Sequence, residues 1–370
     1  MEDVITIQVG NRVIGYKNLY NDEINQGFEN FYKTCFGGNL ETLEKRLYIF
    51  WPTFFEIAQK YLSSQDEKFS IHDNFFENFT VVSEWLWENG FSEQAARVWA
   101  SVSKFIKEFE KKYFQIHKGS LFYFWSIPLL MLERIDASIL SLHKAVLEDK
   151  RNKPNEWRDN PAHQVLSLSD NPNPYLRNLL IDPVLVFISK RISLYNSRYS
   201  RNFSISELRT LFLDNPAIET ETIYYFTLSI YKLTYIRRLS DLGLGQSTIG
   251  PLVLNSSIGS VLLIWENLLR QSYEGRYLRN LTASLMDDSG TAWGNSTVRT
   301  GKANDDANKN LVRCIKRRKD RNLRQDLLLG YVLRNNTFHS LESDDYLWQI
   351  HTDLIQIIFN CLFTALKPKK

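Results

Sequence analysis

Residues 344–366 read DDYLWQIHTDLIQIIFNCLFTAL and contain neither glycine nor proline. Their apolar side chains recur every three or four residues, which places them on one face of a helix. The members of this stripe are Leu347, Ile350, Leu354, Ile357, Ile358, Cys361, Leu362 and Ala365. The stretch therefore predicts a long helix that buries this stripe against other helices, and Ser343 is well placed to cap it.

The whole chain shares this helical bias. Its 370 residues include only 16 glycines and 10 prolines, whereas these two residue types make up roughly 12% of an average chain. Hydrophobic residues at 44% and charged residues at 24% indicate a globular protein and exclude the disordered, collagenous and coiled-coil classes. We predict an all-α protein, and the length implies two or three domains.

Few residue types in the chain suit metal or redox chemistry. There are three distant cysteines and six histidines, with no HExxH or CxxC motif. We therefore expect no disulfide framework, no metal and no cofactor, and a reducing, cytoplasmic setting. The net charge of +3 is too small to indicate nucleic-acid binding by itself. The most apolar stretch, residues 121–132 (LFYFWSIPLLML), is far shorter than the roughly 20 residues that span a bilayer, so we expect no membrane segment.

The N-terminal part of the chain combines a hairpin with turn–helix units. Residues 4–16 alternate apolar and polar side chains around Gly10-Asn11, which predicts a two-residue hairpin within a segment at 1–24. Three later turns, at 38–41, 90–93 and 134–136, each lead into a helical pattern. Such units resemble degenerate tetratricopeptide-like repeats, which bury their faces by stacking. We predict a helical-repeat, solenoid-like domain over 25–150, with an irregular helical bundle as the alternative.

Further boundaries follow from composition. The Asn- and Pro-rich stretch at 151–175 predicts a linker, and 176–242 a helical connecting region. A second turn-rich boundary at 241–251 precedes a C-terminal domain at 245–370. Its apolar helix GSVLLIWENLLRQSY (259–273), a polar loop at 287–310 and three later helices predict a four-helix bundle with a large loop.

Residues 327–343, LLLGYVLRNNTFHSLES, carry the chemistry. Arg334 lies eleven residues after Leu323 and three after Tyr331, so it shares a helical face with apolar residues. A buried, unpaired cation is costly, so Arg334 should meet either a carboxylate or the phosphate of a ligand.

This stretch resembles the R-x4-6-H signature of the HEPN superfamily, in the variant with a polar residue directly after the arginine. The helix GSVLLIWENLL (259–269) is also similar to the first helix of such bundles. The resemblance covers about residues 245–370 and implies a HEPN-type four-helix bundle that acts as a metal-independent endoribonuclease. It also implies a homodimer in which two motifs meet, and roles in bacterial defence or toxin activity.

The residue chemistry agrees with RNA cleavage through the 2′-hydroxyl. That reaction needs a proton-transferring group of near-neutral pKa and a cation beside the phosphorane. We assign the first role to His339, the second to Arg334, and the orientation of either to Asn335. Positions five apart on a helix point about 140° apart, so either the helix breaks after Asn335 or a second copy completes the site. A basic run upstream could bind RNA phosphates or form a solvated helix face: Arg313, Lys316, Arg317, Arg318, Lys319, Arg321 and Arg324.

Other interpretations stay open at this point. The R-x4-6-H spacing is expected about once by chance, and Arg158 to His163 also matches it. We treat that match as a decoy, because it lies in the Asn- and Pro-rich break and off any predicted helix. Arg334 and His339 could also close the bundle as a buried polar cluster. The protein could instead be a non-catalytic repeat scaffold or an inactive nucleotide-binding HEPN protein. In each case the N-terminal repeats could bind a protein or nucleotide regulator.

Overall fold

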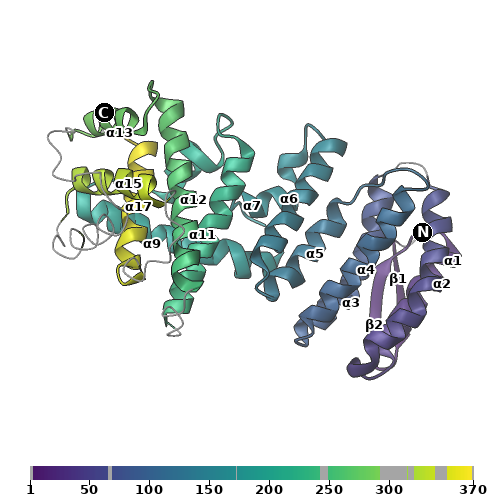
Figure 1. The fold of residues 1–370 in the computed structure, drawn as a ribbon. Helices are drawn as coiled ribbons and strands as arrows, with labels where there is room; N and C mark the ends of the chain where they lie inside the picture. The colour runs from purple at the N-terminus through teal and green to yellow at the C-terminus, as the bar shows by residue number, and fades with distance from the viewer. Residues whose placement is uncertain are drawn as a thin grey trace. The chain divides into compact units, whose positions relative to one another are not determined.

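The computed structural model describes residues 3–65, 69–171, 173–241, 249–291, 315, 321–337 and 348–368. This part of the chain is mostly helical, with one small two-stranded sheet near the N-terminus (Figure 1). The all-α prediction is thereby confirmed at the level of fold class. The chain divides into two compact units, one formed by residues 1–166 and 170–179 and the other by 167–169 and 180–370.

The first unit begins with the hairpin and continues with helices. Its elements are β1 (Val4–Val9), β2 (Arg12–Lys17), α1 (Asp22–Phe36), η1 (Leu40–Thr42), α2 (Leu43–Ser63), α3 (Phe69–Glu88), α4 (Ser92–Glu110), α5 (Gly119–Met131), α6 (Ile135–Asn152), η2 (Trp157–Asp159), α7 (Pro161–Leu166) and α8 (Pro174–Leu176). The hairpin prediction is confirmed, since Val9 pairs with Arg12 around Gly10-Asn11. The three turn–helix predictions are confirmed as the starts of α2, α4 and α6.

Consecutive helices pack most extensively in this unit, as the pairs α1–α2, α3–α4 and α5–α6. Their core is aromatic: the rings of Phe28, Phe54 and Phe79 contact one another at centroid distances of 5.1–5.8 Å. Edge-to-face ring contacts of this kind add stability beyond the apolar area that they bury.

The hairpin is attached to α3, because the side chain of Asn78 hydrogen-bonds both backbone groups of Lys17, at 2.7 and 3.0 Å.

The segment predicted as a linker, 151–175, contains η2, α7 and α8. Trp157 is buried there, with the cations of Lys150 and Arg158 at 4.4 and 4.5 Å from its ring. Burial of a large aromatic ring is what orders a polar stretch that composition alone predicts to be irregular.

The second unit contains the longer apolar helices. Its elements are η3 (Arg177–Ile181), which crosses the boundary between the units, α9 (Asp182–Tyr199), α10 (Ile205–Leu208), η4 (Arg209–Leu213), α11 (Thr220–Asp241), α12 (Ile249–Ser272), α13 (Leu278–Asp288), α15 (Leu323–Thr337) and α17 (His351–Leu366). Helix α12 packs against α11, α13, α15 and α17, and α17 also packs against α9. The region predicted as a separate connector, 176–242, therefore contributes α9 and α11 to the same unit as the C-terminal helices.

Helix α17 is buried on nearly all its faces from Leu354 to Ala365, and not only along the predicted stripe. Its polar residues Gln356, Asn360 and Thr364 recur every fourth position and form a second, hydrogen-bonded stripe. Residues 344–347 of the predicted helix lie outside the described residues. A helix can be enclosed completely when one face is apolar and the polar side chains of the other face have hydrogen-bond partners.

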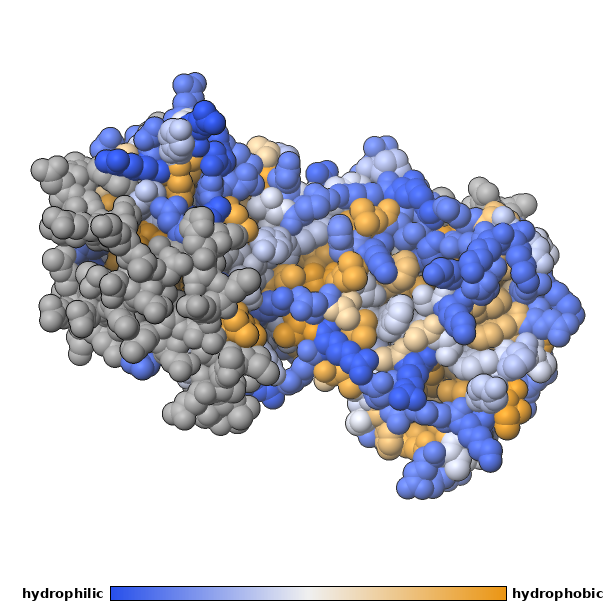
Figure 2. Space-filling view, in the orientation of Figure 1, coloured by the Kyte–Doolittle hydropathy of each residue, from blue (hydrophilic) through white to orange (hydrophobic). Residues whose placement is uncertain are grey.

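One helix of the described part of the chain, Leu252–Ser272 within α12, is long and apolar enough to cross a membrane, with a mean hydropathy of 1.4. In the structure, 61% of the apolar 18-residue window of this helix is buried, and α12 contacts four other helices. This is how the central helix of a globular unit behaves. Figure 2 shows a visible face covered largely by hydrophilic residues, with apolar patches between them.

Candidate functional site

Helix α15 presents Arg334 near its C-terminal end. The helix begins with a reciprocal cap: the Gln325 backbone N–H donates to Asn322 Oδ1 at 3.0 Å, and the Asn322 N–H donates to Gln325 Oε1 at 3.1 Å. Gly330 lets α15 approach Cys361 of α17 closely, because a β-carbon there would meet the cysteine sulfur. This contact and the cap fix the axis of the helix that carries Arg334.

Arg334 meets a carboxylate, the first of the two partners that the sequence predicts. Its Nε lies 2.7 Å from Glu266 Oε2, and the two side chains are 18% and 12% exposed. The other oxygen of Glu266, Oε1, accepts from Nε of Arg270 at 3.1 Å. One carboxylate of α12 is thus shared by two guanidinium groups at a partly exposed position.

The other predicted catalytic residues are placed only in part. Asn335 is half-buried and follows Arg334 on α15. Helix α15 continues to Thr337, so the expected break directly after Asn335 does not occur. His339 lies outside the described residues. The position of the His339 side chain relative to Arg334, and with it the choice between a helix break and a second copy, therefore stays a prediction.

The predicted basic run falls mostly outside the described residues: Arg313, Lys316, Arg317, Arg318 and Lys319. Arg324 is half-buried on α15. Arg321 is 3% exposed, and its Nε and Nη2 donate at 2.9 Å to Asp326 and Asp353. Burial alone would lower the pKa of Arg321, but the two carboxylates raise it. This guanidinium is used inside the unit and does not extend an exposed basic face.

Asp326, the main partner of Arg321, is completely buried. It also accepts hydrogen bonds from the Tyr199 hydroxyl and, at 2.7 Å, from Asn360 Nδ2. The network joins α9 and α17 to α15, which is the helix that bears Arg334. The sequence contains an indication of this network. Asp326 lies three residues after Leu323 and directly before Leu327, on the apolar face of α15, where a charged side chain needs a partner.

The second R-x4-H match differs from its prediction in one respect. His163 lies on the short helix α7, not off a helix, and Arg158 lies in η2. Both flank Trp157, whose ring centroid is 4.9 Å from that of His163. Burial, followed by the charges of Arg158 and Lys150, lowers the pKa of His163 to about 4. The local geometry is that of a packed aromatic cluster.

The first unit contains a charged cluster around His117 that the sequence pattern does not predict. Nδ1 of His117 lies 3.1 Å from Asp73 of α3, and Nε2 lies 3.0 Å from Asp149 of α6. Its backbone N–H donates to Nδ1 of the buried His72 at 3.2 Å, and Ser120 Oγ donates to Asp73 at 2.7 Å. The hydrogen bonds of the cluster join residues that are 32–47 positions apart in the sequence, so no local spacing signals it.

The two flanking carboxylates favour the imidazolium form of His117. Burial alone would lower its pKa, but the hydrogen bonds and charges of Asp149 and Asp73 raise it to about 9. The neighbouring His72 behaves in the opposite way: burial, with a smaller contribution from the charge of His117, lowers its pKa to about 4. Burial also acts to raise the pKa of Asp73, yet its hydrogen bond with His117 leaves it below its usual value.

This geometry predicts that the first unit loses stability in mild alkali. The pKa of His117 is about 9 when folded against 6.5 as a free side chain, so its contribution is complete below pH 6.5 and lost as the pH rises through 9. We expect the free energy of unfolding to fall by about 3 kcal/mol across that window, measured by urea denaturation with circular dichroism. His117→Gln should remove this decrease of the unfolding free energy with pH, whereas His163→Gln should preserve it. An unchanged slope in the His117 variant would contradict the assignment.

Gly119 is predicted to be indispensable to the cluster. A β-carbon at this position would lie 2.7 Å from Asp149 Oδ1 and 2.8 Å from His117 Nε2, closer than such contacts allow. We expect Gly119→Ala to destabilise the protein by roughly 2–3 kcal/mol, because it separates a buried ion pair. The control is Gly27→Ala within α1, whose β-carbon would meet Phe54 at an ordinary 3.5 Å and should be neutral or stabilising. Equal denaturation midpoints for the two variants would refute this prediction.

Within the described residues, no group of three or more histidine, cysteine or acidic side chains is arranged to hold a metal ion. The chain matches no protein-family model, and comparison with curated protein sequences and with solved structures finds no similar protein.

Proposed function

We propose that this chain is a metal-independent endoribonuclease that acts on RNA as a homodimer in the cytoplasm, in bacterial defence or toxin activity. The observation that carries the proposal is the pair of Arg334 with Glu266, 2.7 Å apart and partly exposed, in which Arg334 is the first residue of the RNNTFH stretch (334–339). The packing of α12 against α13, α15 and α17 supports a HEPN-type bundle as its scaffold.

The proposed reaction uses the RNA's own 2′-hydroxyl. Its oxygen attacks the adjacent phosphorus, the bond to the 5′-oxygen breaks, and the products are a 2′,3′-cyclic phosphate and a 5′-hydroxyl. His339 removes the proton from the 2′-hydroxyl or delivers one to the leaving 5′-oxygen. Two copies of His339 across a dimer would supply both functions at one scissile phosphate.

Arg334 would stabilise the charge that develops on the phosphorane oxygens. Glu266 holds this guanidinium through Nε, which limits its rotation before RNA binds, and Arg270 offsets the charge of the same carboxylate. A fixed cation stabilises a transition state better than a mobile one, because no reorganisation is needed during the reaction. Asn335 would orient Arg334 or His339.

The first unit is proposed to act as a sensor or regulatory scaffold. Its helix pairs α1–α2, α3–α4 and α5–α6 support a stacked, tetratricopeptide-like arrangement. In such arrays each pair buries its apolar face against the next, and the exposed faces remain for a protein or nucleotide regulator.

The test is RNA cleavage by the full chain in EDTA, with the ends of the products identified. We expect cyclic phosphate ends, and a loss of roughly 10²–10⁴-fold in rate for His339→Ala, the range of a lost acid–base catalyst. The matched control is His163→Ala, which alters the other R-x4-H match and should keep the wild-type rate. Full activity of His339→Ala, or a requirement for a divalent metal, would reject the proposal.

A further inference from the structure

A cavity of about 170 Å³ lies beside the His117 cluster, within the first unit. It is lined by side chains from α3, α5 and the end of α6, and by residues 160–162. The residues that matter for its chemistry are Asp73, Glu77, Phe124, Asp149, Lys153 and Asn160. Asp149 is buried, whereas Asp73, Glu77 and Lys153 are half-buried, so charges of both signs line one cavity, where charged groups are normally paired as they leave water.

Only one of the two carboxylate oxygens of each aspartate is hydrogen-bonded within this cluster. Oδ1 of Asp73 accepts from His117 and from Ser120, and Oδ1 of Asp149 accepts from His117. In the part of the chain that the structure describes, Oδ2 of both aspartates makes no hydrogen bond. The ammonium of Lys153 and the amide of Asn160 likewise make no side-chain hydrogen bond among the described residues, although the charge of Lys153 contributes to the lowered pKa of Asp73. The cavity therefore brings together acceptors and donors that a ligand could engage.

The charges restrict the class of ligand. His117 and Lys153 are cationic, while Asp73, Asp149 and Glu77 are anionic, and Glu77 also lies 3.8 Å from Lys17. Three carboxylates oppose the entry of a phosphate, and Lys153 opposes a simple polyamine. A small zwitterion meets both requirements, since it carries a cation for the aspartates and an anion for the lysine.

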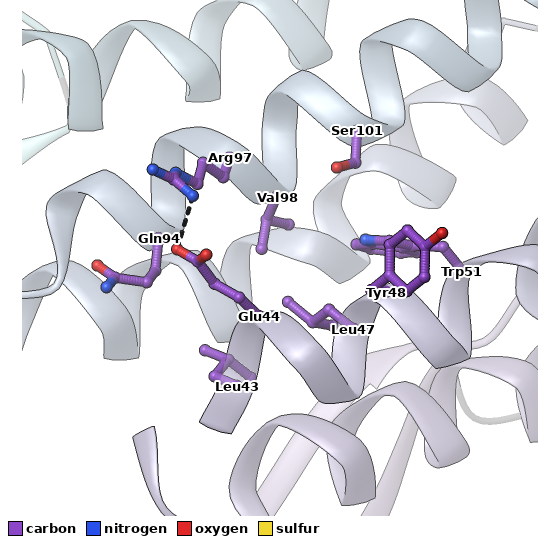
Figure 3. A pocket seen from close by; sticks show the side chains of 9 residues that line it. All are labelled: Leu43, Glu44, Leu47, Tyr48, Trp51, Gln94, Arg97, Val98 and Ser101. Carbon is purple, nitrogen blue, oxygen red and sulfur yellow. Dashed lines mark ion pairs between the residues drawn. The ribbon is translucent and has the colours of Figure 1, made fainter. Parts of the chain in front are cut away.

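The cavity between α2 and α4 offers a useful contrast (Figure 3). Its volume is similar, about 180 Å³, but its charged residues Glu44 and Arg97 already form an ion pair at 2.8 Å. The rest of its wall is largely apolar or aromatic, including Leu47 and Trp51. There the two opposite charges pair with each other, whereas in the α3–α5–α6 cavity Asp73 and Asp149 each pair with His117 through one oxygen, and the described residues offer Lys153 no carboxylate within 4 Å.

We propose that the α3–α5–α6 cavity is a binding site for a free α-amino acid. The ammonium group of the ligand donates to the open oxygens of Asp73 and Asp149, its carboxylate accepts from Lys153 and Asn160, and its side chain lies near Phe124. Binding would connect α3, α5 and α6 through one small molecule, so it would stabilise the first unit. This site is independent of the RNA-cleaving motif.

The test is thermal unfolding of the full chain with each of the twenty free amino acids at millimolar concentration, followed by calorimetric titration of those that raise the midpoint. AMP and spermidine serve as comparison probes. We expect at least one amino acid to bind, and Lys153→Met to weaken it by about tenfold or more, the usual effect of a lost charge-assisted hydrogen bond. Lys112→Met, at an exposed lysine of the same unit, should bind as the wild type does.

Asp73→Asn should weaken binding to a similar degree, but it also alters the His117 cluster and could prevent folding. Lys153→Met avoids this difficulty, since the lysine makes no side-chain hydrogen bond among the described residues. No binding by any amino acid to the folded wild type would overturn the proposal. So would binding that Lys153→Met leaves unchanged, or saturable binding of AMP or spermidine alone.

Discussion

An Arg334→Ala variant is expected to cleave RNA roughly 10²- to 10³-fold more slowly than the wild-type chain. Removal of one fixed group that stabilises developing negative charge has this effect in enzymes that rely on oriented donors. The loss should appear in the maximal rate under single-turnover conditions and persist in EDTA. Arg334→Lys should recover only part of the rate, because an ammonium cannot contact Glu266 and a phosphate with the same planar geometry.

The Arg334 prediction can be separated from misfolding. Glu266 keeps Arg270 as a partner in the variant, so the stability cost should be about 1 kcal/mol or less, as for a partly exposed pair. Arg276→Ala is the matched control, since Arg276 is exposed and lies over the neighbouring Tyr277 ring at 5.8 Å. If Arg334→Ala retains more than half of the wild-type rate, the arginine is structural and the site assignment fails.

The largest effect on stability is expected at Asp326. Asp326→Ala would remove the buried partner of Arg321, at 2.9 Å, along with the acceptor for Tyr199 and Asn360. Breaking a buried pair from one side costs about 3–5 kcal/mol, because Arg321 would lose its buried carboxylate partner and keep the half-exposed Asp353. Urea denaturation should show a correspondingly lower midpoint for the second unit.

The control for Asp326 is built into the same network. Arg321 also contacts Asp353 at 2.9 Å, but the Asp353 side chain is 49% exposed and that of Asp326 is fully buried. Asp353→Ala should cost about 1 kcal/mol or less, since water can replace an exposed partner. Similar costs for the two variants would show that burial does not determine the strength of this network.

The predictions for Arg334 and Arg321 show which contacts could not be predicted from the sequence. Placing Arg334 on an apolar helical face required only the 3.6-residue period, and from this the sequence predicts an anionic partner. Which anion it meets depends on α12 and α15 packing together, because Glu266 lies 68 positions earlier in the chain. Arg321 departs from the predicted basic run for the converse reason: it looks like its neighbours in sequence, and only packing shows that it is buried between two carboxylates.

The sequence by itself determined the local features of this protein. The helical class, the hairpin at Gly10-Asn11 and the starts of α2, α4 and α6 follow from hydrophobic period and turn residues, which act over a few positions. Tertiary structure alone decided the assembly of Asp73, His117 and Asp149, the pairing of Arg334 with Glu266 and the burial of Arg321. These contacts bring together residues from separate helices, and their energies arise from desolvation and charge pairing, which no local pattern encodes.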